Sequence, residues 1–212
     1  MRSLKEIQDF LEREIVPRYD NFDAGHGRDH VLTVMSQAMS LAGFYPEVDK
    51  CLLITAAAYH DLGLGYGRDL HHVHSAAIVR ADERLRQWFS EDEIEIIAQA
   101  AEDHRASSDH EPRSAYGRIV AEADRIIDGE TIVRRALQYG LAHEPALDRD
   151  GHYRRLVAHM QEKYAEGGYL RLWVPQGDNA RRLKEFRQLL EDEPAFREMF
   201  DNIYDTLIQS NK

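Results

Sequence analysis

The sequence predicts an all-α protein of 212 residues. Apolar residues recur at spacings of three and four through most of the chain, which is typical of amphipathic helices. No alternating run of apolar and polar residues is long enough for a core strand. Helix starts are also marked, as by the capping box Ser90-x-x-Glu93. A hydrophobic content of 43% and a charged content of 31% suit a folded domain with a solvated surface.

The first two thirds of the chain should form helices over residues 3–16, 29–43, 46–59, 72–88, 90–104 and 115–127. Pro17 should close the first of these, and Pro46 should open the third. The third contains CLLITAAAY, which is apolar on all sides and is therefore expected to be the central buried helix. It ends in His60-Asp61, before the glycine-rich stretch LGLGYG.

The last third should form helices over residues 129–142, 150–165, 178–190 and 194–209. Between them, GGYLRLWVPQG is rich in glycine and aromatic residues and is the least helical part of the chain. This third has amphipathic helices but no set of ligand residues. We therefore expect residues 1–130 to carry the function and residues 131–212 to be a helical extension packed on them.

Charge and composition exclude several classes of protein. The chain has 27 basic and 38 acidic residues, a net charge of -11, which disfavours binding nucleic acid by a basic surface. No apolar run approaches 18 residues, so no membrane span is expected, and the N-terminus lacks the apolar stretch of a secretory signal. The single cysteine, Cys51, agrees with a reducing compartment, and we expect the protein to be cytoplasmic. The sequence does not indicate the oligomeric state.

Polar residues interrupt the apolar helix faces at four places. His60-Asp61 ends the most hydrophobic helix, and leaving both buried without partners would be costly. Either His60 caps the helix and Asp61 faces solvent, or both face an interior site. His30, His104 and Asp124 also share helix faces with apolar residues. Helical bundles build metal sites from such inward imidazoles and carboxylates on neighbouring helices.

The order His30, His60-Asp61, Asp124 resembles the signature of the HD superfamily of metal-dependent phosphohydrolases. The local strings GHGRDHVLTV, AAAYHDLGLG and YGRIVAEADRIID fit this signature as well. The resemblance covers about residues 20–130. It implies an HD-domain helical bundle, with residues 131–212 as an extension.

The resemblance further implies one divalent metal held by His30, His60, Asp61 and Asp124. Two imidazoles and two carboxylates suit Mn, Fe, Co, Ni, Zn or Mg. Such an ion activates a water molecule, and the two carboxylates cancel its charge, so an anionic substrate can enter an acidic protein.

Some members of this superfamily carry two additional histidines that bind a second metal. His72, at the start of HVHSA, and His104 match them in order. In a one-metal site, the same two histidines would instead contact the substrate phosphate or donate protons as catalytic residues. His71 and His74 compete with His72, and only the family register favours His72, because helical spacing does not decide.

Weaker candidates for substrate binding are Arg105, Arg125 and His26. Arginine recognises phosphate through two parallel hydrogen bonds, although surface salt bridges would explain both arginines equally well. The predicted function is hydrolysis of a nucleotide or another small phosphorylated metabolite by a metal-activated water. The alternative is a non-hydrolytic HD protein, either a di-iron oxygenase that uses six ligands or a ligand sensor.

Overall fold

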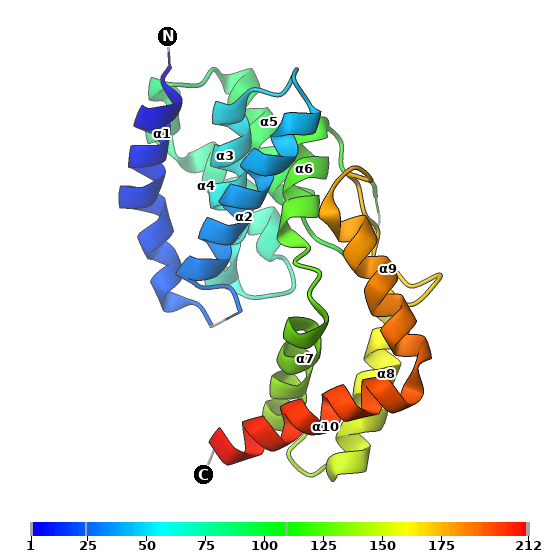
Figure 1. The fold of residues 1–212 in the computed structure, drawn as a ribbon. Coiled ribbons are helices and arrows are strands. Elements are labelled where there is room, and N and C mark those ends of the chain that lie inside the picture. The colour runs from blue at the N-terminus through cyan, green and yellow to red at the C-terminus, as the bar shows by residue number, and fades with distance from the viewer. Residues whose placement is uncertain (1, 24, 109, 211–212) are drawn as a thin grey trace. The chain divides into compact units, whose positions relative to one another are not determined.

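The computed structural model describes residues 2–23, 25–108 and 110–210 (Figure 1). In these ranges the chain forms helices and no strand, which confirms the all-α prediction. The α-helices are α1 (Leu4–Phe10), α2 (Arg28–Leu41), α3 (Lys50–Tyr59), α4 (His71–Ala81), α5 (Glu91–Glu102), α6 (Ala115–Asp124), α7 (Gly129–His143), α8 (Arg149–Tyr164), α9 (Asp178–Glu191) and α10 (Glu193–Ser210).

The chain divides into two compact units. The first comprises residues 1–125 and 172–176, and the second comprises residues 126–171 and 177–212. The division therefore lies close to the predicted boundary at residue 130, but a short segment of the last third belongs to the first unit. The packing of residues 131–212 as an extension stays a prediction.

Helix α3 is the centre of the first unit. All of its residues from Cys51 to Tyr59 are buried, as predicted, and it packs against α2, α4, α5 and α6 (Figure 1). The helix starts later than Pro46 suggested. Asp49 is its N-cap, and the Asp49 carboxylate accepts the backbone N–H groups of Cys51 and Leu52 at 2.7 and 3.4 Å.

The N-terminal helical segment is longer than predicted and changes type. After α1 the chain continues as a π-helix over Leu11–Ile15 and then as a 3-10 helix over Val16–Asn21. Pro17 does not stop it, because Pro17 stands in the first turn of the 3-10 helix, where the missing N–H group is not needed.

Other predicted helices are shorter than expected. The predicted helix 72–88 is interrupted at Asp82, whose extended backbone ends α4 and whose side chain accepts the Arg84 N–H group to start a 3-10 helix, Glu83–Gln87. α6 ends at Asp124, because the backbone of Arg125 leaves the helical region. The predicted capping box is present: Ser90 Oγ accepts the Glu93 N–H group and Glu93 Oε2 accepts the Ser90 N–H group.

The second unit contains α7 to α10 and has its own buried apolar residues: Leu137, Leu156, Met160, Leu183, Phe186 and Phe200. The irregular segment before α9 returns to the first unit at Leu172–Gln176. There, Glu122 Oε2 accepts the backbone N–H groups of Trp173 and Val174 at 2.6 and 3.2 Å. None of the helices in the described part of the chain is apolar over a length that could cross a membrane.

Candidate metal centre

Both residues of the doublet His60-Asp61 face an interior site, and His60 also caps α3. His60 follows α3, and its Nδ1 atom donates to the carbonyl oxygen of Ala57 at 2.8 Å, so it caps the helix. Its other nitrogen, Nε2, points into a buried cluster of imidazoles and carboxylates. Asp61 is only 3% exposed and faces the same cluster instead of solvent.

A first group of possible metal ligands consists of His30, His60 and Asp124, whose donor atoms all lie within 4.8 Å of one another. The Nε2 atoms of His30 and His60 are 3.2 Å apart. Asp124 Oδ1 lies 3.2 Å from His30 Nε2 and 3.7 Å from His60 Nε2. These residues come from α2, the end of α3 and the end of α6, as the sequence predicted.

A second group consists of Asp61, His71 and His104. The Nε2 atoms of His71 and His104 are 3.0 Å apart. Asp61 Oδ1 lies 3.5 Å from His71 Nε2 and 3.3 Å from His104 Nε2. His104 lies two residues after the end of α5, and the structure places it in this group.

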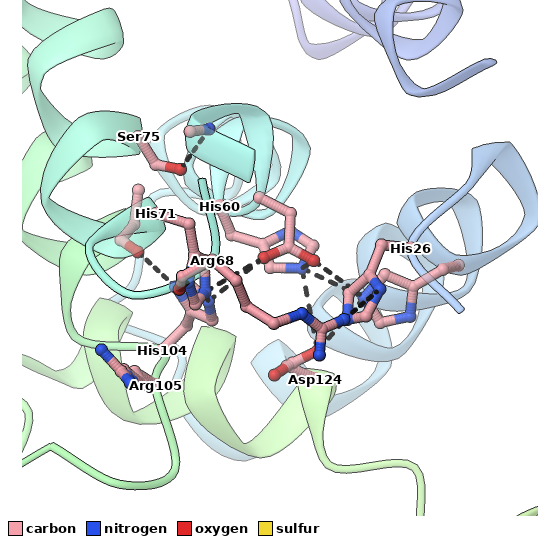
Figure 2. Close-up of polar contacts among 12 residues, drawn as sticks. His26, His60, Arg68, His71, Ser75, His104, Arg105 and Asp124 are labelled. Carbon is pink, nitrogen blue, oxygen red and sulfur yellow. Dashed lines mark hydrogen bonds and ion pairs between the residues drawn. The ribbon is translucent and has the colours of Figure 1, made fainter. Parts of the chain in front are cut away.

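The Asp61 carboxylate lies between the two groups. Its Oδ2 atom is 3.4 Å from His30 Nε2 and 3.2 Å from His60 Nε2, while its Oδ1 atom faces His71 and His104. Figure 2 shows the side chains of both groups converging, with His71 and His104 on one side and Asp124 on the other. One carboxylate thus offers an oxygen to each group, an arrangement that allows it to bridge two ions.

The second group contains His71, whereas the family resemblance favoured His72, whose role stays a prediction. His71 lies there because of a close approach between Gly63, just after the doublet, and the start of α4. A Cβ atom at Gly63 would lie 2.0 Å from the His71 carbonyl oxygen, and the Gly63 N–H group donates to Ser75 Oγ at 2.9 Å. His71 and Ser75 are one helical turn apart, so the face of α4 that packs on Gly63 carries His71.

The donor set fits a divalent cation. The Nδ1 atoms of His60, His71 and His104 each lie 2.6–2.8 Å from a backbone carbonyl oxygen, which can only accept a hydrogen bond. In a neutral imidazole each of these Nε2 atoms then carries a lone pair that points into the site. Two such lone pairs face each other 3.0 Å apart between His71 and His104, which requires a proton or a cation between them. Nitrogen and carboxylate donors together are the ligands of Mn, Fe, Co, Ni and Zn.

Charge coupling within the cluster shifts the pKa of its members. Burial disfavours protonated His60, but Asp61 and Asp124 outweigh burial and raise the pKa of His60 to about 10. Burial and the neighbouring His104 lower the pKa of His71 to about 4. Burial would raise the pKa of Asp61 and of Asp124, but the surrounding histidines hold both well below the usual value. Both carboxylates are therefore charged, as metal ligands need to be.

The cluster is mostly buried, and its members differ in exposure. The side chains of His30, His60, Asp61 and His104 are at most 5% exposed. Asp124 and His71 are more open, with 25% and 13% of their side chains exposed. A small molecule would therefore reach the two groups past Asp124 and His71.

The three predicted substrate-binding residues lie in different environments. Arg125 is buried, and its guanidinium group donates to the carbonyl oxygen of Ala121, so it turns into the fold and away from the surface. Arg105 donates to the backbone oxygen of Asp69. The His26 ring centroid lies 5.8 Å from that of His30, which places His26 beside the first group.

Arg68 could not be selected from the sequence, although its backbone and side chain both lie near the groups (Figure 2). Arg68 belongs to a loop, and no helical spacing links it to the histidines. Buried Glu122 was also missed, although it shares α6 with Asp124 and is a charged residue among apolar ones. That pattern was the available signal for a partner inside the fold.

Comparison with known proteins agrees with this geometry. Residues 27–127 match the family model of the HD domain. The matched segment spans α2 to α6 and includes all six residues of the two groups. A solved structure of a predicted HD superfamily hydrolase from an uncultured Thermotogales bacterium is 22% identical, with a TM-score of 0.49, and the match covers 74% of this chain and 87% of that one. A search of curated proteins finds no match.

Proposed function

We propose that the HD domain is a metal-dependent phosphohydrolase that acts on a nucleotide or another small phosphorylated metabolite. The observation that carries this proposal is the pair of His/Asp groups that share Asp61. Six nitrogen and oxygen ligands converge there, and Asp124 and His71 are the most exposed of the six. The family match supports the same class of activity.

In this proposal His30, His60, Asp61 and Asp124 hold one divalent ion, and Asp61, His71 and His104 hold a second one. A divalent ion supplies Lewis acidity and positive charge, which activate water and polarise a phosphoryl oxygen. The protein keeps the ligands in place through the backbone carbonyl oxygens that accept from His60, His71 and His104. Burial of four ligands limits water to the open side of the site.

The local charge suits an anionic substrate in spite of the net charge of -11. The two carboxylates of the cluster, Asp61 and Asp124, match the charge of one divalent ion. Arg68 and Arg105 lie next to the groups and add positive charge on the loop side. A phosphate group can therefore approach this side of the protein without net repulsion.

The test is a screen of phosphorylated metabolites with the full chain loaded with Mn, Co, Ni, Zn or Fe. We expect hydrolysis that a chelator abolishes and that added metal restores. His60→Ala and Asp61→Ala should lose both metal and activity, because each removes a ligand from the cluster. Asp20→Ala is a matched control, since Asp20 is exposed and pairs with the exposed Arg28. A variant at position 60 or 61 that kept full metal and full activity would contradict the proposal.

A second candidate is a di-iron oxygenase, which the count of six ligands in two groups also favours. Metal analysis separates the candidates. Two iron ions per chain, with an absorption spectrum that depends on oxygen and no hydrolysis in the screen, would support oxygenation. A ligand sensor would bind a phosphorylated molecule without turning it over.

A further inference from the structure

Arg68 contacts a ligand of one group and a neighbour of the other. It lies in the loop before α4, and its carbonyl oxygen accepts the Nδ1 hydrogen of His71 at 2.7 Å. Its side chain extends in the other direction, where Nη2 lies 3.1 and 3.3 Å from the two ring nitrogens of His26 (Figure 2). The His26 ring neighbours the ring of His30. Arg68 therefore touches a ligand of the second group with its backbone and a neighbour of the first group with its side chain.

The guanidinium group of Arg68 is weakly held in this position. Its acidic partner is Asp23, at a long distance of 3.5 Å, and both side chains are more than half exposed. Asp23 Oδ1 already accepts from Gly25 N and from His26 Nδ1, both at 2.8 Å. Because His26 Nδ1 donates to Asp23, it cannot also accept a hydrogen bond from Arg68, and the ring accepts from Arg68 through Nε2 at the longer distance of 3.3 Å. An exposed ion pair of this kind contributes little, so an anion can displace Asp23.

The other two candidate arginines are tied to the protein. Arg125 is buried and donates to a backbone carbonyl oxygen of its own helix. Arg105 donates to Asp69 O and, at 3.0 Å from Nε, to Ser107 Oγ. Arg105 therefore holds the loop that carries Arg68. Of the three, Arg68 is the one whose guanidinium group is bonded to other side chains near the surface and not to a backbone carbonyl oxygen, so it can exchange a partner for a ligand.

We propose that Arg68 binds the phosphate group of the substrate on the solvent side of the two ligand groups. The phosphate then replaces Asp23 as the ion-pair partner of Arg68. This inference rests on the proposed function and specifies the substrate. The arginine fork takes two oxygens of one phosphate. A terminal phosphate has three unesterified oxygens, so it still presents one oxygen to the His/Asp groups. A phosphodiester has two, so one oxygen would have to serve both the arginine fork and the His/Asp groups, and Arg68 should therefore favour monoesters and terminal phosphates of anhydrides.

The test measures anion binding without turnover. Inorganic phosphate, methyl phosphate and dimethyl phosphate are titrated calorimetrically into the metal-loaded full chain. Phosphate and methyl phosphate should bind, and dimethyl phosphate should bind at least about tenfold more weakly. Arg68→Ala should weaken phosphate binding by about tenfold or more, and Arg68→Lys by less, because lysine keeps the charge but loses the fork. Metal content should stay unchanged, since the partner of His71 is the backbone oxygen of Arg68.

Two further variants sharpen the test. Arg80→Ala is the matched control, because Arg80 is also exposed but lies further along α4 and is bonded to Glu95; it should leave phosphate binding unchanged. Asp23→Asn should tighten phosphate binding by about two- to fivefold, because it removes the charge that competes for Arg68. Weaker binding in Asp23→Asn would overturn the exchange of partners.

The result separates this inference from the proposed function. If wild-type protein binds no phosphate, or if Arg68→Ala binds it as tightly as wild type, the role of Arg68 is overturned whatever the activity. Equal binding of dimethyl phosphate would overturn the selection of terminal phosphates. If Arg68-dependent phosphate binding is found but no phosphorylated substrate is hydrolysed, the role of Arg68 stands and the proposed hydrolysis fails.

Discussion

His60, His71 and His104 are fixed in the same way. In each, one imidazole nitrogen donates to a backbone carbonyl oxygen three residues earlier, those of Ala57, Arg68 and Ala101. For His60 and His104 this carbonyl belongs to the last turn of a helix, where it has no partner within the helix. One hydrogen bond thus ends the helix, fixes the tautomer and aims the other nitrogen at the site.

At this scale the register of α4 can be tested by metal content. In the two-ion site, His71→Ala and His104→Ala should each lower the bound metal from two ions to one per chain, whereas His72→Ala should retain two. If one ion is bound, His104→Ala should keep it and reduce turnover by about 10²–10⁴-fold, as expected for a lost acid or base. Metal analysis and rate are measured on the same preparations. If His72→Ala lost one ion and His71→Ala kept both, His72 and not His71 would be the ligand, as the family resemblance favoured.

The site residues that could be predicted are those that the apolar pattern of their own helix identifies. His30, His60, Asp61, His104 and Asp124 interrupt apolar faces, and this pattern can be recognised in the sequence. The choice between His71 and His72 depends on how closely α4 approaches Gly63, which is a contact between two elements. Arg68 depends on a loop conformation, so helical spacing carries no information about it.

Among the elements, the loop after α5 is held by one buried ion pair. Asp103 follows α5 directly and precedes His104, and its side chain is fully buried. It accepts three hydrogen bonds from Arg113 at 2.7–2.9 Å, two from the guanidinium group and one from the backbone N–H group. Both ends of the polar loop are therefore joined, and the end of α5 that carries His104 is fixed.

Loss of the Arg113 side chain should therefore destabilise the first unit. Arg113→Ala leaves the buried Asp103 carboxylate with a backbone donor but without its counter-charge, and we expect a loss of about 1–3 kcal/mol in the free energy of unfolding. Urea denaturation followed by circular dichroism gives this value. Arg118→Ala is the control, because Arg118 is an exposed residue of α6. Equal stability of the two variants would show that the ion pair does not hold the loop.

The approximate ranges of the α-helices follow from the sequence, but several helix ends and the π-helix and 3-10 segments do not. The capping box at Ser90 is local and was predicted correctly. The break at Asp82 is stabilised by partners from other elements, since the Asp82 carboxylate accepts from the Tyr59 hydroxyl group at 2.7 Å. The pattern of apolar residues within one helix does not reveal such a contact with another helix.

At the scale of the whole molecule, the chain passes between the two units three times, at residues 125/126, 171/172 and 176/177. The segment Leu172–Gln176 belongs to the first unit although it is flanked by residues of the second. Its attachment there is specific. Val174 is fully buried, and the buried Glu122 carboxylate accepts the N–H groups of Trp173 and Val174.

This attachment predicts how the protein behaves when the chain is cut. A protease cut between residues 126 and 130 should leave the two pieces associated in gel filtration, because residues 172–176 keep their contacts in the first unit. Glu122→Ala removes the acceptor of two backbone N–H groups, so a larger fraction of the nicked protein should dissociate. Exposed Glu12→Ala is the control, and unchanged metal content shows that the HD domain remains folded. Release of a stable 131–212 fragment from nicked wild-type protein would contradict both the attachment and the assignment of residues 131–212 as an extension.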